Sequence, residues 1–488
     1  SPFYIFNTTI NTYGGVFLDQ SGPPLWNPPF YSVKVDQEQT IPINGVNHKF
    51  YFMNWTGTDV QFEDANSNET GVVFDNANAS AQAVLKGTQL SDYIYTYSQN
   101  GQRKFIRTPD GYLHTFYASM DGVWYERSTN TGQSWDLIHS EYPPLDNVVF
   151  KNPSMSFYNA PVVHEVLAYA VDYIDPLEPN KNDVVCIRNF VDGVTSQYAA
   201  EISTTDPLNS TYVYSNPVVA CAQNGNTLVV WQTIKDGVGK KLQYAYGYWN
   251  SNGVWQLYDT GNISNSALGS YNPTLCASLT ADPITFHLAW NEGNDVYYEK
   301  LTLGSFNQLV TSTKQLVSSG SGYLYNFKPS IIEFNDIPKI SWIGSRYMEQ
   351  QNQSTLEYKT ILKHLDNNTY NRFGHHINSV SLERDDYSNY VLGWSQFDSR
   401  SSKFVTNQNN LSQIFNFGIT GDYLKIGNGS DLDNMYGMIY DAGSLPYKFI
   451  QSNSINDIMN PMNKITSLSI NTGREGVVYI DTAQFYFA

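Results

Sequence analysis

The sequence predicts an all-β protein, and three observations lead to this fold class. Residues that favour strands are abundant, and Tyr alone occurs 37 times. Asn, Gly, Ser and Pro recur about every ten residues, which is the spacing of short strands joined by turns. No long segment carries apolar residues at the period of an amphipathic helix. With 488 residues, the chain is long enough to bury a large core.

Four segments repeat one pattern, a short strand, a polar turn and a second strand that ends in Trp. They are SNPVVACAQNGNTLVVW (215–231), YNPTLCASLTADPITFHLAW (271–290), FKPSIIEFNDIPKISW (327–342) and INSVSLERDDYSNYVLGW (377–394). A constant spacing of 56 residues separates the prolines Pro217, Pro273 and Pro329, and one of 52 separates Trp290, Trp342 and Trp394. A third strand follows the first three segments, and the same order can be read earlier, at 110–128 and 152–190.

A single four-stranded sheet of this kind cannot bury both of its faces alone. Packing several around an axis buries them, which predicts a β-propeller of six or seven blades. The expected blades cover 97–150, 151–205, 206–264, 265–318, 319–373 and 374–430. Residues 431–488 are either a last blade or a ring-closing segment, whose strand GVVYIDTAQFYF is expected to pair with the first blade.

Residues 1–90 do not follow the repeat. Residues 1–34 are expected to form an N-terminal extension, and residues 35–90 a small β-sandwich-like module. The stretch INGVNHKFYFMNWTGTDVQF, followed by NETGVVFDNANASAQAVL, resembles the β-sandwich modules of bacterial and archaeal surface proteins. In those modules a Tyr/Phe-rich strand, a Trp-Thr/Ser-Gly turn and a strand with alternating Ala follow one another.

The composition indicates which partners and which cellular location to expect. The net charge is −17, only 15% of residues are charged and no basic stripe is present, so nucleic acid is not an expected partner. Low charge density with abundant Tyr, Asn, Ser and Thr resembles secreted proteins of acid-loving, archaeal-like thermophiles. No apolar run is long enough for a membrane span, and the chain starts at Ser1 rather than Met, which suggests a removed signal peptide. We therefore expect a secreted or cell-surface protein.

Ten N-x-S/T sequons are glycosylation candidates: Asn7, Asn54, Asn68, Asn78, Asn209, Asn262, Asn352, Asn367, Asn410 and Asn428. The three cysteines form no CxxC motif and no cluster with His at zinc spacing, so neither a metal site nor a cofactor is expected. Cys221 and Cys276 fall in the first strands of adjacent units, which allows a disulfide. Their offsets from the repeat prolines differ by one residue, which favours opposite side-chain directions instead.

The stretch RSTNTGQSWDLI (127–138) is either a catalytic motif or a structural turn. Ser128, Asn130, Gly132 and Trp135 resemble the Asp-box, S-x-D-x-G-x-x-W, of sialidase-like (BNR-repeat) propellers, with Asn in place of Asp. Asn makes the same local bonds to the backbone, and Gly supplies a positive φ. The resemblance implies a peripheral turn whose Trp packs between blades, so the motif is expected to be structural. WNSNGVW (249–255) is a degenerate copy.

The same resemblance implies where a sialidase site would lie. Such enzymes use three arginines, an Asp acid and a Tyr/Glu nucleophile pair. Arg107-Thr108-Pro109 matches the Arg-x-Pro motif of the family and Asp121 is the nearest acid, so Arg107 and Asp121 are the candidate catalytic residues. The second arginine has no counterpart in HTFYASMDG (114–122), and Asp121 is expected in a hairpin turn. The charged stretch LERDDYSN (382–389) is expected to be a solvated hairpin.

Three functions follow from these features, and binding or assembly is favoured over catalysis. The first is non-catalytic binding of glycans or other surface proteins on an aromatic-rich, weakly charged face. The second is a structural subunit of an extracellular filament or coat, in which the tail AQFYFA joins copies of the chain by strand exchange. The third is a divergent, exo-acting sialidase-type glycoside hydrolase. A pocket lined with Tyr and Trp would favour the first function, docked termini the second, and carboxylates beside Arg107 at the axis the third.

Overall fold

The fold is that of a computed structural model, in which the chain forms two compact units. One unit combines Ser1–Leu90 with Asn471–Ala488, and the other is Ser91–Ile470. The structure describes residues 17–19, 31–43, 46–74, 80–87, 98–119, 122–132, 135–141, 148–159, 161–173, 183–203, 212–235, 238–264, 266–279, 283–350, 353–384, 389–430, 434–440, 447–452, 467–469 and 475–478.

The first unit contains two four-stranded antiparallel sheets in its described part. One has the order β1 (Phe17–Asp19), β2 (Tyr31–Lys34), β6 (Glu69–Phe74), β5 (Val60–Phe62). The other has the order β3 (Glu38–Ile43), β4 (Val46–Thr58), β7 (Ser80–Gly87), β37 (Glu475–Val478). The buried Trp55 packs against Phe52 and Phe62, and its indole N–H donates to Ser67 O at 2.9 Å.

Three sequence-based expectations for this unit differ from the structure. The segment 1–34 contributes β1 and β2, and β2 pairs with β6, so it belongs to a sheet rather than being a separate extension. Trp55-Thr56-Gly57 lies within β4, and the turn comes at Asp59, whose φ is 52°. The strand Glu475–Val478 pairs with β7, Val477 opposite Val84, and so does not pair with the first propeller sheet.

The second unit consists of antiparallel sheets that follow one another along the chain, seven in its described part. The first four sheets are β8 to β11 (Phe105–Arg107, Leu113–Ser119, Gly122–Ser128, Asp136–Glu141), β12 to β15 (Val148–Asn159, Val163–Tyr173, Val184–Val191, Val194–Glu201), β16 to β19 (Tyr212–Cys221, Thr227–Lys235, Val238–Trp249, Trp255–Ser264) and β20 to β24 (Ser270–Ala277, Thr285–Glu292, Asp295–Leu303, Leu309–Thr311, Gln315–Leu316). The last three are β25 to β28 (Tyr325–Phe334, Ile337–Gln350, Gln353–His364, Tyr370–Phe373), β29 to β32 (Ile377–Arg384, Tyr390–Gln396, Ser401–Thr406, Phe415–Thr420) and β33 to β36 (Tyr423–Ile426, Asn434–Tyr440, Tyr447–Ser452, Ser467–Ser469).

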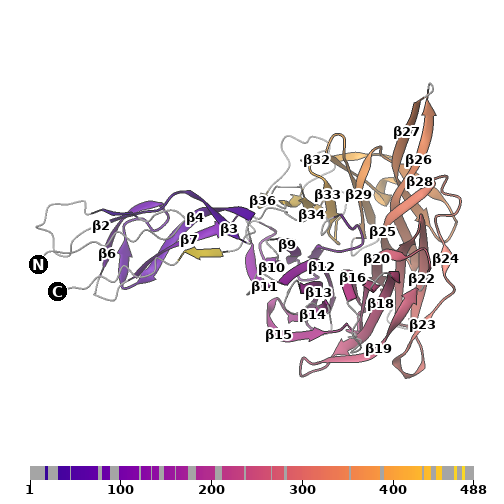
Figure 1. The fold of residues 1–488 in the computed structure, drawn as a ribbon, viewed down its shortest axis with the longest axis horizontal. Coiled ribbons are helices and arrows are strands. Elements are labelled where there is room, and N and C mark those ends of the chain that lie inside the picture. Colours follow the sequence, from indigo (N-terminus) through magenta and orange to yellow (C-terminus); the bar gives the residue numbers. More distant parts are fainter. Residues whose placement is uncertain are drawn as a thin grey trace, which may run out of the picture. The chain divides into compact units, whose positions relative to one another are not determined.

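These sheets are arranged as the blades of a β-propeller (Figure 1). We call the first strand of each sheet its inner strand: β8, β12, β16, β20, β25, β29 and β33. From β12 onward each inner strand contacts the next, β12 also contacts β8 and β9, and β34 of the last sheet contacts β8 of the first. The ring therefore closes by side-by-side packing of the first and last sheets. The last sheet begins at Tyr423, before the boundary of 431 expected from the sequence.

The apolar core lies between consecutive sheets, and the repeated tryptophans occupy it. Trp231, Trp290, Trp342 and Trp394 are all 0% exposed. Each lies in the second strand of its sheet, which continues past the Trp, so the repeat does not end there as the sequence suggested. A lone sheet would leave these indoles in contact with water. Each sheet is therefore stabilised by packing against the sheets on either side of it.

The repeated prolines mark a bulge in four inner strands. The pairing register shifts across the dipeptides Asn152-Pro153, Asn216-Pro217, Asn272-Pro273 and Lys328-Pro329. The residue before each proline has a φ between 51° and 54°, a left-handed conformation that Asn adopts more readily than most residues. The bulge turns carbonyl groups out of the ladder, where they serve as acceptors for the axial segment described below.

Candidate functional site

Residues 99–104 (QNGQRK), which we call the axial segment, run between the inner strands. The Asn100 amide donates to Lys328 O at 2.5 Å and accepts from Val380 N at 3.1 Å. The Gln102 amide donates to Asn152 O at 2.9 Å and to Pro217 O at 3.1 Å. These bonds join the axial segment to β12, β16, β25 and β29, and three of the four use carbonyls at the proline bulges.

The remaining contacts complete a circle around the axial segment. The Arg103 guanidinium donates through Nη1 to Leu275 O of β20 at 3.3 Å, and Lys425 of β33 donates to Gln99 O. A Cβ on Gly101 would lie 2.2 Å from Pro273 O, so no larger residue fits there. The axial segment therefore closes the centre of the propeller and contacts the inner strand of every sheet from the second to the seventh.

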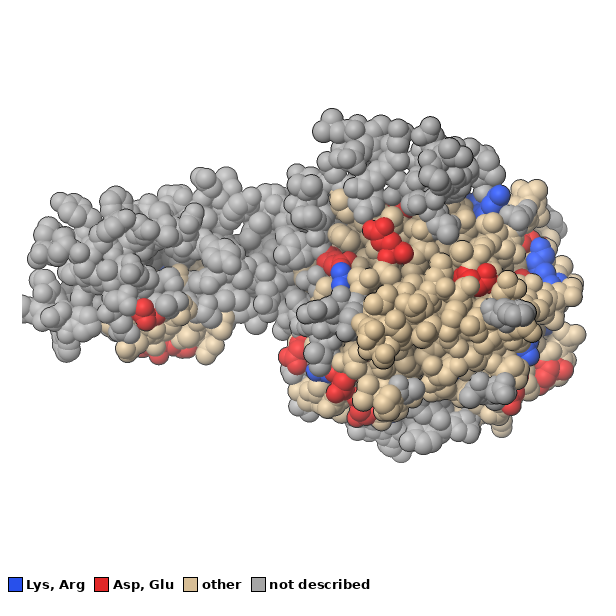
Figure 2. All heavy atoms as spheres, turned by 90° about the horizontal axis from the view of Figure 1, so that it is seen from below, with Lys and Arg blue, Asp and Glu red and all other residues tan. Residues whose placement is uncertain are grey.

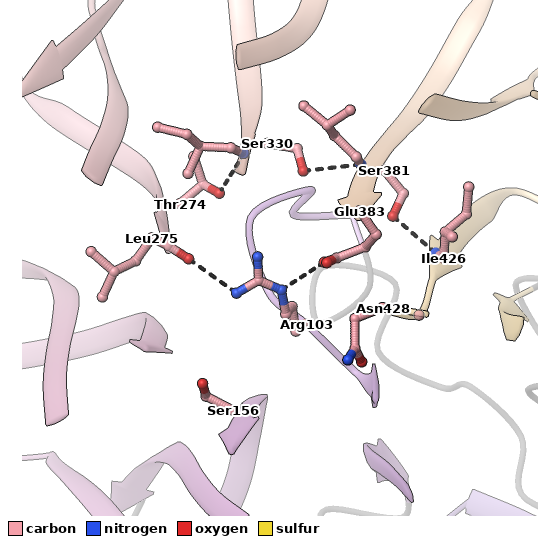
Figure 3. A network of polar contacts seen from close by, with 12 residues as sticks. Arg103, Ser156, Thr274, Leu275, Ser330, Ser381, Glu383, Ile426 and Asn428 are labelled. Atoms are coloured by element: carbon pink, nitrogen blue, oxygen red, sulfur yellow. Dashed lines mark hydrogen bonds and ion pairs between the residues drawn. The ribbon is translucent and has the colours of Figure 1, made fainter. Parts of the chain in front are cut away.

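Hydroxyl groups join neighbouring inner strands around the same axis (Figure 3). They accept backbone N–H groups of the following strand, in the pairs Val219 N to Ser154 Oγ, Cys221 N to Ser156 Oγ, Ile331 N to Thr274 Oγ1, Leu382 N to Ser330 Oγ, Leu424 N to Ser379 Oγ and Ile426 N to Ser381 Oγ. Between the last and first sheets, Asn428 takes over this role: its amide accepts from Arg107 N and donates to Arg107 O, both at 2.8 Å.

A pocket of about 460 Å³ opens at the end of the axis where the inner strands terminate. Its wall combines charged and amide groups with apolar side chains from the inner strands of the first four sheets and the loops that follow them. The lining residues are Arg103, Ile106, Pro109, Ser156, Phe157, Asn159, Cys221, Gln223, Cys276, Ala277, Ser278, Leu279, Glu383, Arg384 and Asn428. Tyr and Trp, which we expected in a glycan pocket, are absent from this described lining.

The floor of the pocket carries an ion pair that the sequence did not reveal. Arg103 Nε donates to Glu383 Oε1 at 2.7 Å, with side chains that are 18% and 6% exposed. Burial alone lowers the pKa of Arg103, but the Glu383 carboxylate raises it above its ordinary value. Arg384 donates to Glu333 O at 3.1 Å. The solvated hairpin expected at 382–389 is therefore wrong for its first residues, because Glu383 and Arg384 line the pocket.

Two buried His–Tyr–Glu clusters lie between sheets, and one of them reaches the pocket wall. In the first, His114 Nδ1 lies 2.8 Å from Tyr125 Oη and its Nε2 lies 3.9 Å from Glu165. Burial lowers the pKa of His114 to about 3 and raises that of Glu165 to about 8, so this pair is uncharged at neutral pH.

The second cluster repeats this geometry between the fourth and fifth sheets. His287 Nδ1 lies 2.8 Å from Tyr298 Oη, and its Nε2 lies 2.8 Å from Glu333 Oε2. Glu333 Oε1 accepts from the Ser278 hydroxyl at 3.0 Å and from Leu279 N at 3.2 Å, and both of those residues line the pocket. Burial alone raises the pKa of Glu333, but these hydrogen bonds hold it below its ordinary value. This cluster fixes one wall of the pocket.

The catalytic candidates from the sequence are not placed in this pocket. Arg107 ends β8, where its backbone binds Asn428, and its guanidinium lies over the Tyr436 ring at 5.6 Å. Arg107 does not line the pocket. Asp121 lies outside the described residues.

The Asp-box-like stretch connects β10 and β11, the third and fourth strands of the first sheet. The buried Ser128 hydroxyl donates to Asn130 Oδ1 at 2.9 Å and accepts from Gly132 N at 2.7 Å, and Gly132 has a φ of 83°. Trp135 contacts Phe105 of β8 in its own sheet, with ring centroids 5.8 Å apart. This turn forms hydrogen bonds within itself, and none of its described residues lines the pocket.

The cysteines are all free, so the disulfide allowed by the sequence is not formed. Cys221 packs in the apolar cluster between the second and third sheets, and Cys276 in the one between the fourth and fifth. The two side chains point away from each other because of the one-residue difference in offset. Burial raises the pKa of Cys221 to about 11 and that of Cys276 to about 12, which leaves both as unreactive thiols.

This arrangement predicts that reducing agent leaves the melting temperature unchanged. Thiol titration of protein unfolded without reductant is expected to give three free thiols per chain, and native protein far fewer, since Cys221 and Cys276 are buried. A count of one thiol after unfolding would show that a disulfide exists and that this packing is wrong.

Of the ten glycosylation candidates, Asn7, Asn78, Asn209 and Asn352 lie outside the described residues. Asn262, Asn367 and Asn410 are exposed and Asn54 is half-buried. The amides of two others are used in hydrogen bonds: Asn68 donates to Val35 O at 2.8 Å and Asn428 to Arg107 O. A sugar attached to either amide nitrogen would break that hydrogen bond. The exposed Asn262, Asn367 and Asn410 are therefore the better glycosylation sites.

No group of three or more His, Cys, Asp or Glu in the described part of the chain is placed to hold a metal ion. No helix of the described residues is long and apolar enough to cross a membrane. On the face of the propeller in Figure 2, the visible Lys and Arg side chains are scattered among uncharged residues and acidic groups.

The fold and the axis define the class of this protein: a β-propeller whose centre is closed by its own chain and which carries a pocket at one end of the axis. No protein-family model matches the chain, and no curated protein matches it.

Several glycosidases are among the solved structures that align with this fold. A Hadza microbial sialidase aligns with a TM-score of 0.38 and 9% identity over 80% of this chain and 77% of that one. The GH93 α-L-arabinofuranosidase of Fusarium graminearum aligns with 0.43 and 8% over 77% and 99%. Trypanosoma rangeli sialidase aligns with 0.37 and 8% over 72% and 57%. Scores and identities this low carry no information about activity.

Proposed function

We propose that this protein is a secreted or cell-surface β-propeller that binds a glycan in the axial pocket without cleaving it. The observation that carries the proposal is the pocket itself. Its volume of about 460 Å³ falls within the range of roughly 300 to 1,000 Å³ of small-molecule sites. Its wall is fixed by inner strands that hydrogen bonds hold together, so it is preformed.

The chemistry of the lining suits a sugar. Asn159 and Gln223 at the exposed rim offer amide donors and acceptors for hydroxyl groups. Phe157 and Leu279 offer apolar surface for the C–H face of a sugar ring. The Arg384 side chain donates to Glu333 O through Nη1, and its guanidinium carries further N–H groups that can donate to a ligand.

The carboxylates argue against hydrolysis. Glycosidases of the common type need two carboxyl groups that flank the scissile bond. Glu383 is the single carboxylate of the described lining, and it is paired with Arg103. Glu333 lies behind the wall and is occupied by His287, Ser278 and Leu279. Burial raises the pKa of Glu383 above its ordinary value even beside Arg103, but the described lining offers it no second carboxyl group as a partner.

Glycan-array screening followed by calorimetry tests the proposal. Gln223→Ala and Asn159→Ala are each expected to weaken binding of the best ligand about tenfold, the loss of one or two hydrogen bonds. The matched control is Asn252→Ala, an exposed amide in the β18–β19 turn of the same sheet as Gln223. Arg107→Ala, which the sialidase resemblance would make most damaging, is expected to bind normally.

Two results would contradict the proposal. Equal weakening in the Asn252→Ala control would show that the glycan binds outside the pocket. If no glycan on the array bound to the protein, the proposed glycan-binding function would be wrong. Release of reducing sugar that Glu383→Gln abolishes would show a glycosidase instead of a binding protein.

A further inference from the structure

A lysine and two aspartates lie together at one end of the second sheet. Lys151 of β12 pairs with Ala170 of β13, and Asp172 lies two residues further along β13. Asp183 comes directly before Val184, where β14 begins beside β13. Paired residues, and residues two apart in a strand, share one face of a sheet. The Lys151 and Asp172 side chains therefore project from the same face.

The three side chains contact one another and are largely removed from water. Lys151 Nζ donates to Asp172 Oδ2, and these two side chains are 9% and 24% exposed. The Asp183 carboxyl group hydrogen-bonds to that of Asp172, and its Oδ2 accepts from Tyr214 N of β16 at 3.2 Å. Asp183 is 7% exposed. Asp172 thus has an amine and a second carboxyl group as its neighbours.

The second carboxyl group carries a proton. Two carboxylates repel one another, so they hydrogen-bond only when one of them is protonated. Burial, and then the hydrogen bond to Asp172, raises the pKa of Asp183 far above its ordinary value, which assigns the proton to Asp183. An ion pair between Lys151 and Asp172 does not require such an acid, whereas a reaction between these two groups does.

We propose that Lys151 and Asp172 become joined by an intramolecular isopeptide bond and that Asp183 transfers the proton for this reaction. The product is an amide between Lys151 Nζ and Asp172 Cγ, and one water molecule is released. The bond links β12 to β13 before the bulge at Asn152-Pro153, whereas the pocket is lined by the far end of β12. This modification is independent of glycan binding in the pocket.

The arrangement supplies what amide formation needs. In this buried site the Lys151 ammonium group passes one proton to the Asp172 carboxylate, which leaves a neutral amine beside a carboxylic acid. Asp183 then donates its proton to an Asp172 oxygen while Nζ attacks Cγ, so that the N–C bond forms, the C–O bond breaks and water leaves. The second proton lost by Nζ restores Asp183. No oxidant, reductant or further reactant takes part.

Mass spectrometry tests the bond directly. The full chain, produced in a host that does not glycosylate it and then unfolded, is expected to weigh one water molecule less than its sequence. After digestion, Lys151 and Asp172 are expected in one branched peptide, which distinguishes the isopeptide bond from dehydration within a single aspartate. The full sequence mass together with an unbranched peptide map would overturn the proposal.

The same digest contains an internal control. Lys339 and Asp366 form an ion pair at 3.6 Å, and the Asp366 side chain is 39% exposed. Because water reaches this carboxylate, the two residues are expected on separate, unmodified peptides. A branched peptide at Lys339 as well would show that linkage does not depend on the buried acid, and it would contradict the mechanism.

Two matched variants test the role of Asp183. Asp183→Asn keeps the size of the side chain but carries no transferable proton, so most molecules are expected to have the full mass of their sequence and no branched peptide. Asp398→Asn, which changes an exposed aspartate of the same unit, is expected to keep both the mass deficit and the branched peptide. Circular dichroism checks that both variants fold. Equal amounts of branched peptide in both variants would overturn the role assigned to Asp183.

Loss of the bond is also expected to lower the melting temperature. A covalent link between residues 151 and 172 closes a loop and restricts the unfolded chain, as a disulfide does. Asp183→Asn should therefore melt about 5 °C below the wild-type protein, and Asp398→Asn within about 1 °C of it. An Asp183→Asn variant that lacks the branched peptide and yet melts at the wild-type temperature would show that the bond does not stabilise the propeller.

Discussion

Replacing Gly101 by Ala is expected to lower the free energy of unfolding by about 3 kcal/mol, because the axial segment no longer fits. The added Cβ would lie 2.2 Å from Pro273 O and 2.6 Å from Thr274 Cβ. Both neighbours belong to β20, which is packed between two other inner strands and cannot move aside. Denaturant titration followed by tryptophan fluorescence measures the loss.

Gly320→Asn is the matched control for this substitution. Gly320 has a φ of 83° and no atom within 4 Å of an added Cβ, and Asn tolerates the left-handed conformation. The change is expected to stay below about 0.5 kcal/mol. Comparable losses in both variants would mean that the close approach of Gly101 to β20 is not what stabilises the axis.

Removing the Glu383 carboxylate is expected to cost about 3 to 5 kcal/mol, the usual loss when one partner of a buried ion pair is deleted. In Glu383→Ala, the Arg103 guanidinium keeps its charge and loses its single counter-charge. The double variant Arg103→Met/Glu383→Ala should recover most of the stability, since no unpaired charge remains. A double-mutant cycle from denaturant titrations measures this coupling.

The half-exposed pair Arg346–Glu357 provides the comparison. Its N–O distance of 2.9 Å is similar, but the Arg346 side chain is 39% exposed. Arg346→Gln is therefore expected to cost less than about 1 kcal/mol. If Glu383→Ala were equally mild, the Arg103–Glu383 pair would not hold the axial segment in place.

The predictions for Gly101→Ala and Glu383→Ala both depend on the axial segment, which the sequence analysis did not recognise. Residues 99–104 carry no hydrophobic period and no motif, and Asn-Gly-Gln-Arg-Lys is the composition of an ordinary surface loop. Such a loop is buried only because bulges in distant strands offer carbonyl acceptors to its side chains. One signal was available: Ser154 and Ser156, like Ser379 and Ser381, alternate with buried apolar residues such as Met155 and Val380. Hydroxyls on one side of a buried strand indicate hydrogen bonds to a neighbouring backbone.

The residues of the candidate site could not be predicted from the sequence either. Arg107 matched a family motif, yet its guanidinium packs on Tyr436, while Arg103, four residues earlier, reaches the pocket. The stretch LERDDYSN appeared solvated because it is charged, and a single sequence does not reveal that an arginine 280 residues earlier pairs with Glu383. The two His–Tyr–Glu clusters take their glutamates from the following sheet, so they too depend on contacts between sheets.

The sequence by itself determined the architecture of this protein. The spacing of its prolines and tryptophans reports local events, a bulge in an inner strand and a buried indole in the next, and these repeat wherever the same sheet is built. The tertiary structure decided everything at the axis: the closing of the ring through Asn428, the direction of Cys221 and Cys276, and the burial of Arg103 and Lys425. In the first unit, it decided the pairing of Glu475–Val478 with β7. The reason is physical, since a repeat constrains each sheet separately, whereas charge and hydrogen bonding at the centre depend on all of the sheets together.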